Sequence, residues 1–233
     1  MSRLFARRRL LAVGLSIALA IPVAVLSSSV AEATHPSFKE ISFRDSGPRV
    51  NLTQRVLDVD PRTGVYNHKT QRAVHKFQDR HGFATTGIVN ERTWKAIEKR
   101  WESIQQARLR IDRKYNRIMR VARHQKGDPY VYGADGPGAF DCSGLILFSY
   151  RKATGRSLPH SASAQSDLGE RVSRRAARPG DLVIFQSGGE VYHAGIYAGR
   201  GDLIHASRPG TNVKRDPIWT NRGVYYVRLL PKR

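Results

Sequence analysis

The 233-residue sequence predicts an α+β protein with two folded parts joined by a long basic helix. Three observations support this prediction. Residues 47–98 repeat apolar side chains at helical spacing, residues 97–122 continue that spacing without Gly or Pro, and residues 181–206 contain three short apolar segments typical of strands. We therefore expect a small three-helix bundle, a linker helix, and a domain in which helices pack on an antiparallel sheet.

The composition is strongly basic and contains a single cysteine. Lys and Arg number 40 against 19 Asp and Glu, so the formal charge is +21. This excess favours a polyanionic partner, which is nucleic acid, anionic lipid or an acidic wall polymer, and composition alone does not choose among them. A hydrophobic share of 40% supports a buried core, and the single Cys excludes an intrachain disulfide or a multi-cysteine zinc site.

The N-terminus has the three parts of an export signal. Met1–Arg9 is basic, Leu10–Leu26 is apolar, and Ala31-Glu32-Ala33 is a small-residue cleavage site. We expect a signal peptide over residues 1–33 that is cleaved, which leaves no stable membrane insertion, and a flexible segment over 34–46. An uncleaved anchor is the alternative, because the apolar run approaches the length of a spanning helix. The Sec and twin-Arg routes both stay open, and export argues against nucleic acid as the partner.

Residues 47–100 are expected to form the three-helix domain. Pro48–Val59 has apolar residues at helical spacing, and a turn-rich stretch ends that helix. Asn67 is a suitable N-cap for a second helix over His68–His81, and Asn90 is a suitable N-cap for the third. These helices carry no catalytic constellation.

The second and third of these helices contain a recognisable motif. Its two strings are Thr70-x-x-Ala73-Val74-x-x-Phe77-Gln78 and Gly82-Phe83-x-x-Thr86-Gly87-x-Val89-x-x-x-Thr93-Trp94. Over residues 47–98 the sequence resembles the peptidoglycan-binding domain of many exported wall hydrolases. The resemblance implies that this domain binds peptidoglycan. The chain departs from the family at Thr53, where leucine is usual.

Residues 101–115 are assigned to a basic linker helix that runs into the second domain. Apolar residues at a 4-3 spacing predict an amphipathic helix, and they are Ile97, Trp101, Ile104, Ile111, Tyr115, Ile118 and Ala122. A rigid linker, a coiled-coil seam and a wall-contacting rod are alternatives. The simplest prediction is a helix that packs partly on its own domains, because three heptads do not require a coiled coil.

The only cysteine, Cys142, is placed at the start of a predicted helix. That helix runs to about Ala153 and is capped by Gly155. Free N–H groups and the helix dipole favour the thiolate at this position, and the thiolate is the nucleophilic form of cysteine. Cys142 is therefore a candidate nucleophile, which needs a base and a residue that orients the base.

Two histidines on neighbouring predicted strands are candidates for those roles. The strands are expected at Asp181–Phe185, Val191–Tyr197 and Leu203–Ala206, with a short turn before the last. Antiparallel pairing places His193 beside His205 on the sheet face opposite the helix. A zinc site built from these histidines and the cysteine is the alternative. No fourth ligand stands out, so we predict neither a metal nor a cofactor.

Six strings of residues occur in order along the second domain. They are Pro129-Tyr130-Val131-Tyr132-Gly133, Phe140-Asp141-Cys142-Ser143-Gly144, Leu158-Pro159 with Ser161 and Gln165, Pro179-Gly180-Asp181-Leu182-Val183, His193-x-Gly195-Ile196-Tyr197 and Ile204-His205-Ala206. With these strings, residues 116–231 resemble the NlpC family of bacterial cell-wall cysteine peptidases. The resemblance implies a papain-like catalytic domain over residues 116–233.

The same resemblance implies a role for individual residues. Cys142 is the nucleophile, His193 the general base and acid, and His205 the residue that orients the imidazole. Tyr130 is expected to help form the oxyanion site. The residues expected to contact the substrate are Asp141, Ser143 and Ser161. The chain departs from the family at His160, where arginine is common, and this departure bears on substrate preference.

The resemblance also implies a function for the whole chain. We expect a secreted, wall-associated cysteine endopeptidase that hydrolyses peptidoglycan stem peptides at the bond between γ-D-glutamate and a diamino acid such as meso-diaminopimelate. A non-catalytic wall-binding scaffold and a basic surface or nucleic-acid binder are the alternatives. The sequence leaves open the exact bond, the oligomeric state, and whether the first domain or the linker helix inhibits the site.

Overall fold

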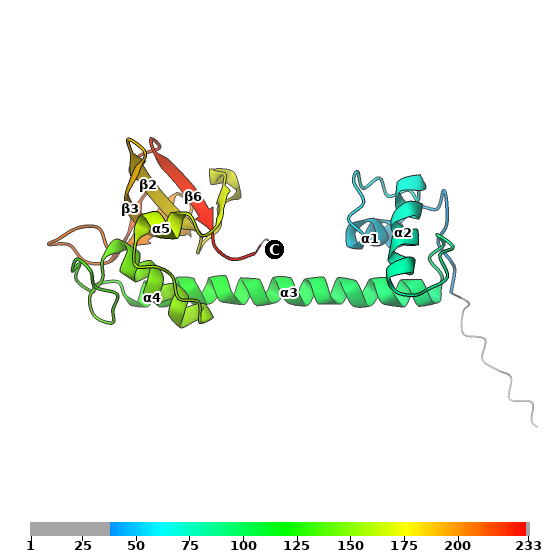
Figure 1. The fold of residues 1–233 in the computed structure, drawn as a ribbon, viewed down its shortest axis with the longest axis horizontal. Helices are drawn as coiled ribbons and strands as arrows, with labels where there is room; N and C mark the ends of the chain where they lie inside the picture. Colours follow the sequence, from blue (N-terminus) through cyan, green and yellow to red (C-terminus); the bar gives the residue numbers. More distant parts are fainter. Residues whose placement is uncertain (1–37, 232–233) are drawn as a thin grey trace, which may run out of the picture. The chain divides into compact units, whose positions relative to one another are not determined.

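The computed structural model describes residues 38–231, so the predicted signal peptide and residues 34–37 lie outside the described residues. Figure 1 shows the course of the chain. The helices are α1 (Pro48–Val56), α2 (His68–Arg80), α3 (Glu91–His124), α4 (Cys142–Thr154), α5 (Ala162–Ser166) and the 3-10 helix η1 (Arg174–Ala176). The strands are β1 (Glu170–Val172), β2 (Leu182–Ser187), β3 (Glu190–Gly199), β4 (Asp202–His205), β5 (Lys214–Pro217) and β6 (Val224–Arg228). Over this part of the chain, no helix has both the length and the apolar character needed to cross a membrane.

Helices α1 and α2 and the start of α3 enclose a small apolar core. Its buried side chains are Ile41, Val50, Val56, Tyr66, Val74, Phe77, Val89 and Ile97. Asn67 caps α2 by accepting a hydrogen bond from the Thr70 N–H, and Asn90 caps α3 through the Thr93 N–H. Both caps confirm the prediction, whereas α1 ends three residues earlier than predicted.

Residues 39–46, which lie in the segment predicted to be flexible, are instead bound to the first domain by backbone hydrogen bonds. Ile41 is 5% exposed and exchanges two backbone hydrogen bonds with Val89, of 3.1 and 2.9 Å. A second backbone bridge joins Ser46 to Val65. The burial of Ile41 and these backbone bridges together hold this segment against the first domain.

Two buried glutamines hold the loops that follow α1 and α2. Gln54 donates from Nε2 to the Val65 carbonyl and accepts from the Gly64 N–H through Oε1, both at 2.9 Å. Gln78 makes the matching pair of bonds in the loop after α2. Because each amide satisfies one donor and one acceptor of the loop backbone, the loop conformations depend on these two side chains.

Helix α3 is one continuous element of 34 residues that contributes to two apolar cores. Ile97 is buried in the first core. Tyr115, Ile118, Met119 and Ala122 are buried in the core of the second domain. No α3 residue between Ile97 and Tyr115 is fully buried, although Trp101 and Ile111 pack partly against the two cores. The prediction of one long amphipathic helix is confirmed.

The second domain is a six-stranded antiparallel sheet with the strand order β1-β6-β2-β3-β4-β5. Helix α4 packs on one face, where its apolar residues share a core with Ile184, Ala194 and Ile196. Phe185 and Tyr197 belong to a smaller cluster on the opposite face. The predicted α+β fold of helices on an antiparallel sheet is confirmed. Three of the strands were predicted, whereas β1, β5 and β6 were not.

A buried ion pair joins the sheet to α3. Asp181 is fully buried and lies 2.8 Å from Nη2 and 3.2 Å from Nε of Arg228. The hydroxyl of Tyr115 donates to the same carboxylate at 3.2 Å. The carboxylate of Asp181 therefore connects the start of β2 to β6 and to α3. Each polar group at this point has a partner.

Asp181→Ala is expected to lower the free energy of unfolding by about 3–5 kcal/mol, because Arg228 would lose its counter-charge while buried. Asp202→Ala is the matched control. Asp202 pairs with Arg215 at 2.8 Å near the surface, and pairs of that kind contribute about 1 kcal/mol or less. Urea unfolding followed by circular dichroism measures both variants. Equal losses in the two variants would contradict the proposed importance of the buried pair.

Candidate active site

Cys142 is the first residue of α4, as the sequence predicts, and it is partly exposed. The backbone N–H groups of Ala194 on β3, of Ser143 and of Cys142 itself lie near enough to its sulfur to lower the pKa of the thiol. Because the Ala194 N–H lies near this sulfur, the start of α4 meets the middle of β3. Ala194 directly follows His193 in the sequence. The structure thus places the predicted nucleophile next to the strand that carries the predicted base.

The carboxylate of Asp141 organises the start of α4. It accepts hydrogen bonds from the backbone N–H groups of Gly144 at 2.6 Å and Gly133 at 2.9 Å, and from the Ser143 hydroxyl at 3.0 Å. Nε2 of His160 lies 3.0 Å from both carboxylate oxygens. Burial raises the pKa of Asp141, but these hydrogen bonds outweigh it and hold the pKa below its ordinary value. Asp141 is therefore an ionised group next to the thiol.

The expectation that the helix N-terminus favours a Cys142 thiolate is wrong for the free protein. Burial raises the pKa of the thiol, and the negative charge of Asp141 raises it further. Hydrogen bonds from the Ala194 and Ser143 N–H groups lower the pKa, but by less. The main reason is the burial of the sulfur, and the residue that caps the helix adds to it as an anion. Cys142 starts as a thiol and needs a base.

His193 and His205 lie side by side on neighbouring strands, with Nε2 of His193 2.8 Å from Nδ1 of His205. Both are buried, and His193 packs against Phe185 on the sheet face away from α4, as predicted. Burial lowers the pKa of His193 to about 3, and the nearby His205 adds to this effect. Burial also lowers the pKa of His205. Both imidazoles are therefore neutral at neutral pH.

Asp216 on β5 extends the histidine pair to the surface. Its Oδ2 lies 3.2 Å from Nε2 of His205 and 2.9 Å from Nζ of Lys214. Burial raises the pKa of Asp216, but the hydrogen bonds and charges of these two neighbours outweigh it and lower the pKa. Sequence reasoning missed this residue, because Lys-Arg-Asp-Pro has no apolar alternation and resembles a turn more than a strand.

The contacts around Asp216 determine which nitrogen of each imidazole carries the proton. An ionised carboxylate only accepts, so His205 donates to Asp216 from Nε2, and its Nδ1 is then an acceptor. His193 must donate from Nε2 to that Nδ1. Nδ1 of His193 is left as the basic nitrogen. The site therefore holds one neutral base whose tautomer is set by a chain of two hydrogen bonds.

Tyr130 is half-buried beside the core, and its hydroxyl is within electrostatic reach of Asp141 and of Cys142. Burial is the main cause of a raised pKa at Tyr130, so the hydroxyl stays protonated and is a hydrogen-bond donor. Ser161 caps α5, because its hydroxyl accepts a hydrogen bond of 3.3 Å from the Ala164 N–H. The structure thus gives Ser161 a local structural contact.

Trp219 is a further neighbour of the histidine pair that the sequence did not indicate. Its ring stacks on Phe185, with centroids 4.2 Å apart and an interplanar angle of 4°. Its centroid lies 5.8 Å from that of His193 and 5.5 Å from that of His205. Trp219 shields the pair on this side, and it is nevertheless 52% exposed. It precedes β6 in a loop, where no periodic pattern marks it.

The donor set around the histidines does not suit zinc. His193 and His205 use Nε2 and Nδ1 for each other, and Asp216 engages Nε2 of His205. Only one imidazole nitrogen of the pair, Nδ1 of His193, has no partner among these contacts, and tetrahedral zinc needs four donors. Across residues 38–231, no group of three or more His, Cys, Asp and Glu side chains is arranged to hold a metal ion.

Comparison with known protein families matches this architecture in both parts of the chain. Residues 127–228 match the NlpC/P60 family, and residues 51–97 match the family described as "Putative peptidoglycan binding domain". The chain belongs to the NlpC/P60 family through residues 127–228, and it carries a peptidoglycan-binding module ahead of them.

Two curated relatives are named probable endopeptidases. The relative from Mycobacterium tuberculosis (strain H37Rv) is 38% identical over 111 residues, which cover 48% of this chain and 28% of the relative. The relative from Corynebacterium glutamicum (strain ATCC 13032) is 44% identical over 94 residues, which cover 40% of this chain and 44% of the relative. The chain thus spans less than half the length of these relatives.

Two solved structures are similar to the chain. The NlpC/p60 domain of the peptidoglycan hydrolase SagA is 34% identical, with a TM-score of 0.46, and the match covers 49% of this chain and 97% of that one. RipD from Mycobacterium tuberculosis, described as a non-catalytic NlpC/p60 domain protein adapted to peptidoglycan binding, is 29% identical, with a TM-score of 0.43. That match covers 50% of this chain and 98% of RipD.

Alkylation of Cys142 by iodoacetamide is expected to be slow at neutral pH and to rise only above about pH 8.5, the ordinary pKa of cysteine. A raised pKa keeps the thiol protonated to higher pH, and only the thiolate reacts. Asp141→Asn keeps a good N-cap but removes the charge, so the rise should move to lower pH. Mass spectrometry of the alkylated protein measures the rate. A constant rate from pH 5 to 8 would show a resting thiolate instead.

The tautomer of His193 is expected to depend on Asp216. In the wild type, both imidazoles should carry their proton on Nε2, which ¹⁵N NMR of labelled histidine distinguishes from Nδ1. Asp216→Ala removes the acceptor, so a mixture of tautomers should appear at both rings. Asp216→Asn keeps an acceptor oxygen and should restore the wild-type pattern. Lys214→Ala is the control that leaves the carboxylate in place, and a mixture in that variant would contradict this assignment.

Proposed function

We propose that this protein is an exported cysteine endopeptidase that hydrolyses the stem peptides of peptidoglycan. The observation that carries the proposal is the Cys142 thiol at the start of α4, next to Ala194 of β3, while the preceding residue of that strand, His193, is a neutral imidazole whose Nε2 is engaged by His205. Membership of the NlpC/P60 family and the names of the relatives support it. No cofactor or metal enters the proposed chemistry.

The first half of the reaction forms a thioester. Nδ1 of His193 takes the proton of the Cys142 thiol while the sulfur attacks the carbonyl carbon of the scissile peptide bond. The new negative charge on sulfur raises the proton affinity of His193 as the transfer proceeds. The oxyanion accepts hydrogen bonds from the Tyr130 hydroxyl and from backbone N–H groups at the start of α4. His193 then gives its proton to the leaving amine, and the C–N bond breaks.

The second half of the reaction releases the acyl group. Water loses a proton to Nδ1 of His193 and attacks the thioester, and the C–S bond breaks to give a carboxylic acid and the free thiol. Through both halves His205 and Asp216 hold the tautomer of His193 and its orientation. Neither needs to exchange a proton with the substrate, and each is a positioning residue.

The scissile bond is proposed to join γ-D-glutamate to a diamino acid such as meso-diaminopimelate. This part of the proposal rests on the resemblance of the six sequence strings. Asp141, Ser143 and Ser161 are proposed to contact the substrate. In the free protein Asp141 and Ser143 are already hydrogen-bonded to each other, so their main contribution to substrate binding is the negative charge of the carboxylate.

The remaining parts of the chain are proposed to deliver the enzyme to its substrate. Residues 1–33 direct export and are removed, residues 47–100 bind peptidoglycan, and residues 101–115 link this domain to a catalytic domain over 116–233. The match of residues 51–97 to a peptidoglycan-binding family supports the second of these roles. The protein is then associated with the cell wall, where its substrate lies.

A non-catalytic wall-binding scaffold is the second candidate function. One observation favours it, because the raised pKa of Cys142 leaves a thiol rather than a thiolate in the free protein. RipD, a similar structure, is described as non-catalytic. The hydrogen-bonded series of His193, His205 and Asp216, with Cys142 at the start of α4, favours the enzyme, since a scaffold has no use for a base with a fixed tautomer.

Cys142→Ala is expected to reduce the release of stem fragments from purified peptidoglycan by about 10⁴-fold or more, because no other nucleophile stands at this position. Mass spectrometry of the soluble digest measures the release and identifies the bond that is cut. Binding of the same variant to insoluble peptidoglycan is the control and should match the wild type.

Three outcomes of this experiment separate the proposals. Equal cleavage by the wild type and the variant would remove Cys142 from the mechanism. Wall binding without cleavage by either protein would establish the scaffold. Cleavage at another peptide bond would keep the enzyme and overturn the proposed substrate specificity.

A further inference from the structure

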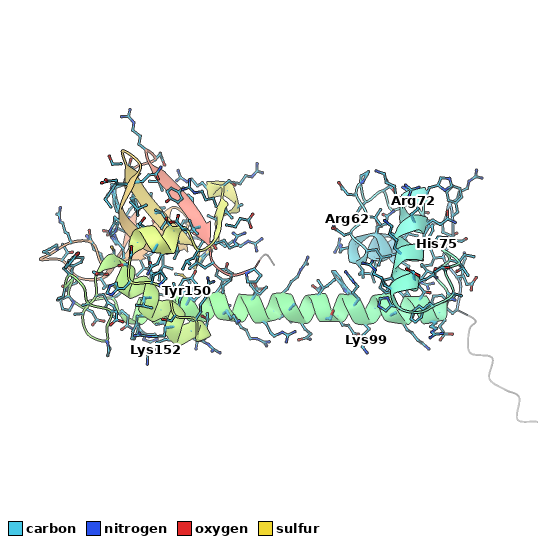
Figure 2. The ribbon with its side chains drawn as sticks, viewed as in Figure 1. Arg62, Arg72, His75, Lys99, Tyr150 and Lys152 are labelled. Atoms are coloured by element: carbon cyan, nitrogen blue, oxygen red, sulfur yellow. The ribbon has the colours of Figure 1, made fainter. Side chains whose placement is uncertain are left out.

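A basic hollow of about 460 Å³ lies where the C-terminal half of α3 meets the end of α4. Its charged lining is Arg110, Arg113, Lys114 and Arg117 of α3 and Lys152 of α4, and these five residues are named the basic groove. The backbone at the end of α4 completes the lining. Figure 2 labels Lys152 on this part of α4.

The spacing of the α3 residues explains how the basic groove forms. Positions 110, 113, 114 and 117 follow the i, i+3, i+4, i+7 pattern, so the four side chains share one face of the helix. In most surface helices the residues in this pattern are apolar and face a core. Here an entire helix face is cationic, although like charges at these spacings repel each other. Such an arrangement calls for an anion outside the helix.

The described part of the chain offers no such anion at the groove. No Asp or Glu lines it, and none of its five cations takes part in an ion pair among the seven found in residues 38–231. Arg117 donates one hydrogen bond to the Ala153 carbonyl at 3.3 Å, which stabilises the end of α4. That contact occupies one cation, and Nζ of Lys152 lies 5.8 Å from the centroid of the Phe148 ring. The exposed Arg110, Arg113 and Lys114 are left for a ligand.

The lining also indicates which kind of polyanion fits. The groove has no aromatic side chain, so it has no surface on which nucleic-acid bases stack. Its apolar lining is one buried alanine, Ala153, so it has no hydrophobic face to insert into a lipid bilayer. Arg guanidinium groups pair with phosphate and with carboxylate oxygens through two hydrogen bonds each. A flexible polyanion without bases fits this lining, and a chain of phosphodiesters supplies one negative charge at every repeat.

We propose that the basic groove binds a linear phosphodiester polymer of the cell envelope. Several adjacent cations then pair with successive phosphates of one chain, and the release of condensed counterions drives binding. The groove is formed by the end of the linker helix together with Arg117 and the end of α4, and it uses no residue of the candidate active site. It therefore adds a second attachment to the wall, and this inference stands whether or not the proposed peptidase activity is found.

The test compares two double variants of equal charge. Arg113→Gln with Lys114→Gln removes two cations from the basic groove. Arg108→Gln with Arg123→Gln removes two exposed cations of α3 that do not line the groove. Binding of the full chain to soluble poly(glycerol phosphate) is measured by calorimetry between 0.05 and 0.2 M salt, these being about the concentrations where phosphate contacts dominate affinity. Poly-glutamate of similar length serves as a carboxylate polymer.

The groove variant is expected to bind poly(glycerol phosphate) about tenfold more weakly than the wild type at 0.1 M salt. The slope of log affinity against log salt concentration should become shallower by about one to two units, because fewer counterions are released. The control variant should bind within about twofold of the wild type, because its lost charges lie outside the contact. Cys142→Ala should bind like the wild type, so this result does not depend on the peptidase proposal.

Four results would overturn the inference. Equal weakening in the two double variants would show that net charge alone attracts the polymer. Equal affinity for poly-glutamate would remove the preference for phosphate. Tighter binding to single-stranded DNA, or to vesicles of phosphatidylglycerol, would identify a nucleic acid or a membrane as the partner instead. Circular dichroism of each variant checks that α3 keeps its helix content.

Discussion

The carboxylate of Asp141 is the single group on which the candidate site depends. It caps the helix that begins with Cys142, fixes the preceding loop through Gly133, and holds His160. These roles need a buried, ionised acid, because only an acceptor with several lone pairs satisfies so many donors. The same charge raises the pKa of the neighbouring thiol. The interaction that builds the start of α4 therefore also works against a resting thiolate.

Because Cys142 is protonated in the free protein, the base that accepts its proton must come from the strands of the sheet. A thiol needs a base, and His193 is kept neutral by burial, with its pKa lowered to about 3. The proton position on His193 is decided two residues away in the hydrogen-bond chain, by the ionised Asp216. Asp216 in turn stays ionised because Lys214 and His205 stabilise it. Helix α4 thus contributes the proton donor, Cys142, whose pKa Asp141 raises. The sheet contributes the proton acceptor, His193, whose tautomer depends on Asp216.

Local sequence chemistry determined the main helices, the positions of Cys142, His193 and His205, and the two strands that carry the histidines. Asn67 and Asn90 mark the starts of their helices because short polar side chains cap the backbone, and Gly155 ends α4 with a positive φ of 74°. The two-residue period of β3 and the short turn before β4 were enough to place His193 beside His205. These features depend on neighbours in the chain, so a sequence pattern contains them.

Only the tertiary structure decided the features that depend on groups far apart in the chain. The pKa of Cys142 is set by burial and by the balance between Asp141 and the Ala194 N–H, and a helix-start rule by itself gives the opposite sign. Asp216 becomes part of the site because β5 pairs with β4, although its polar sequence shows no strand period. The physical reason is the same in each case, since desolvation and hydrogen-bond partners arise when strands pair and helices pack, and no local pattern records them.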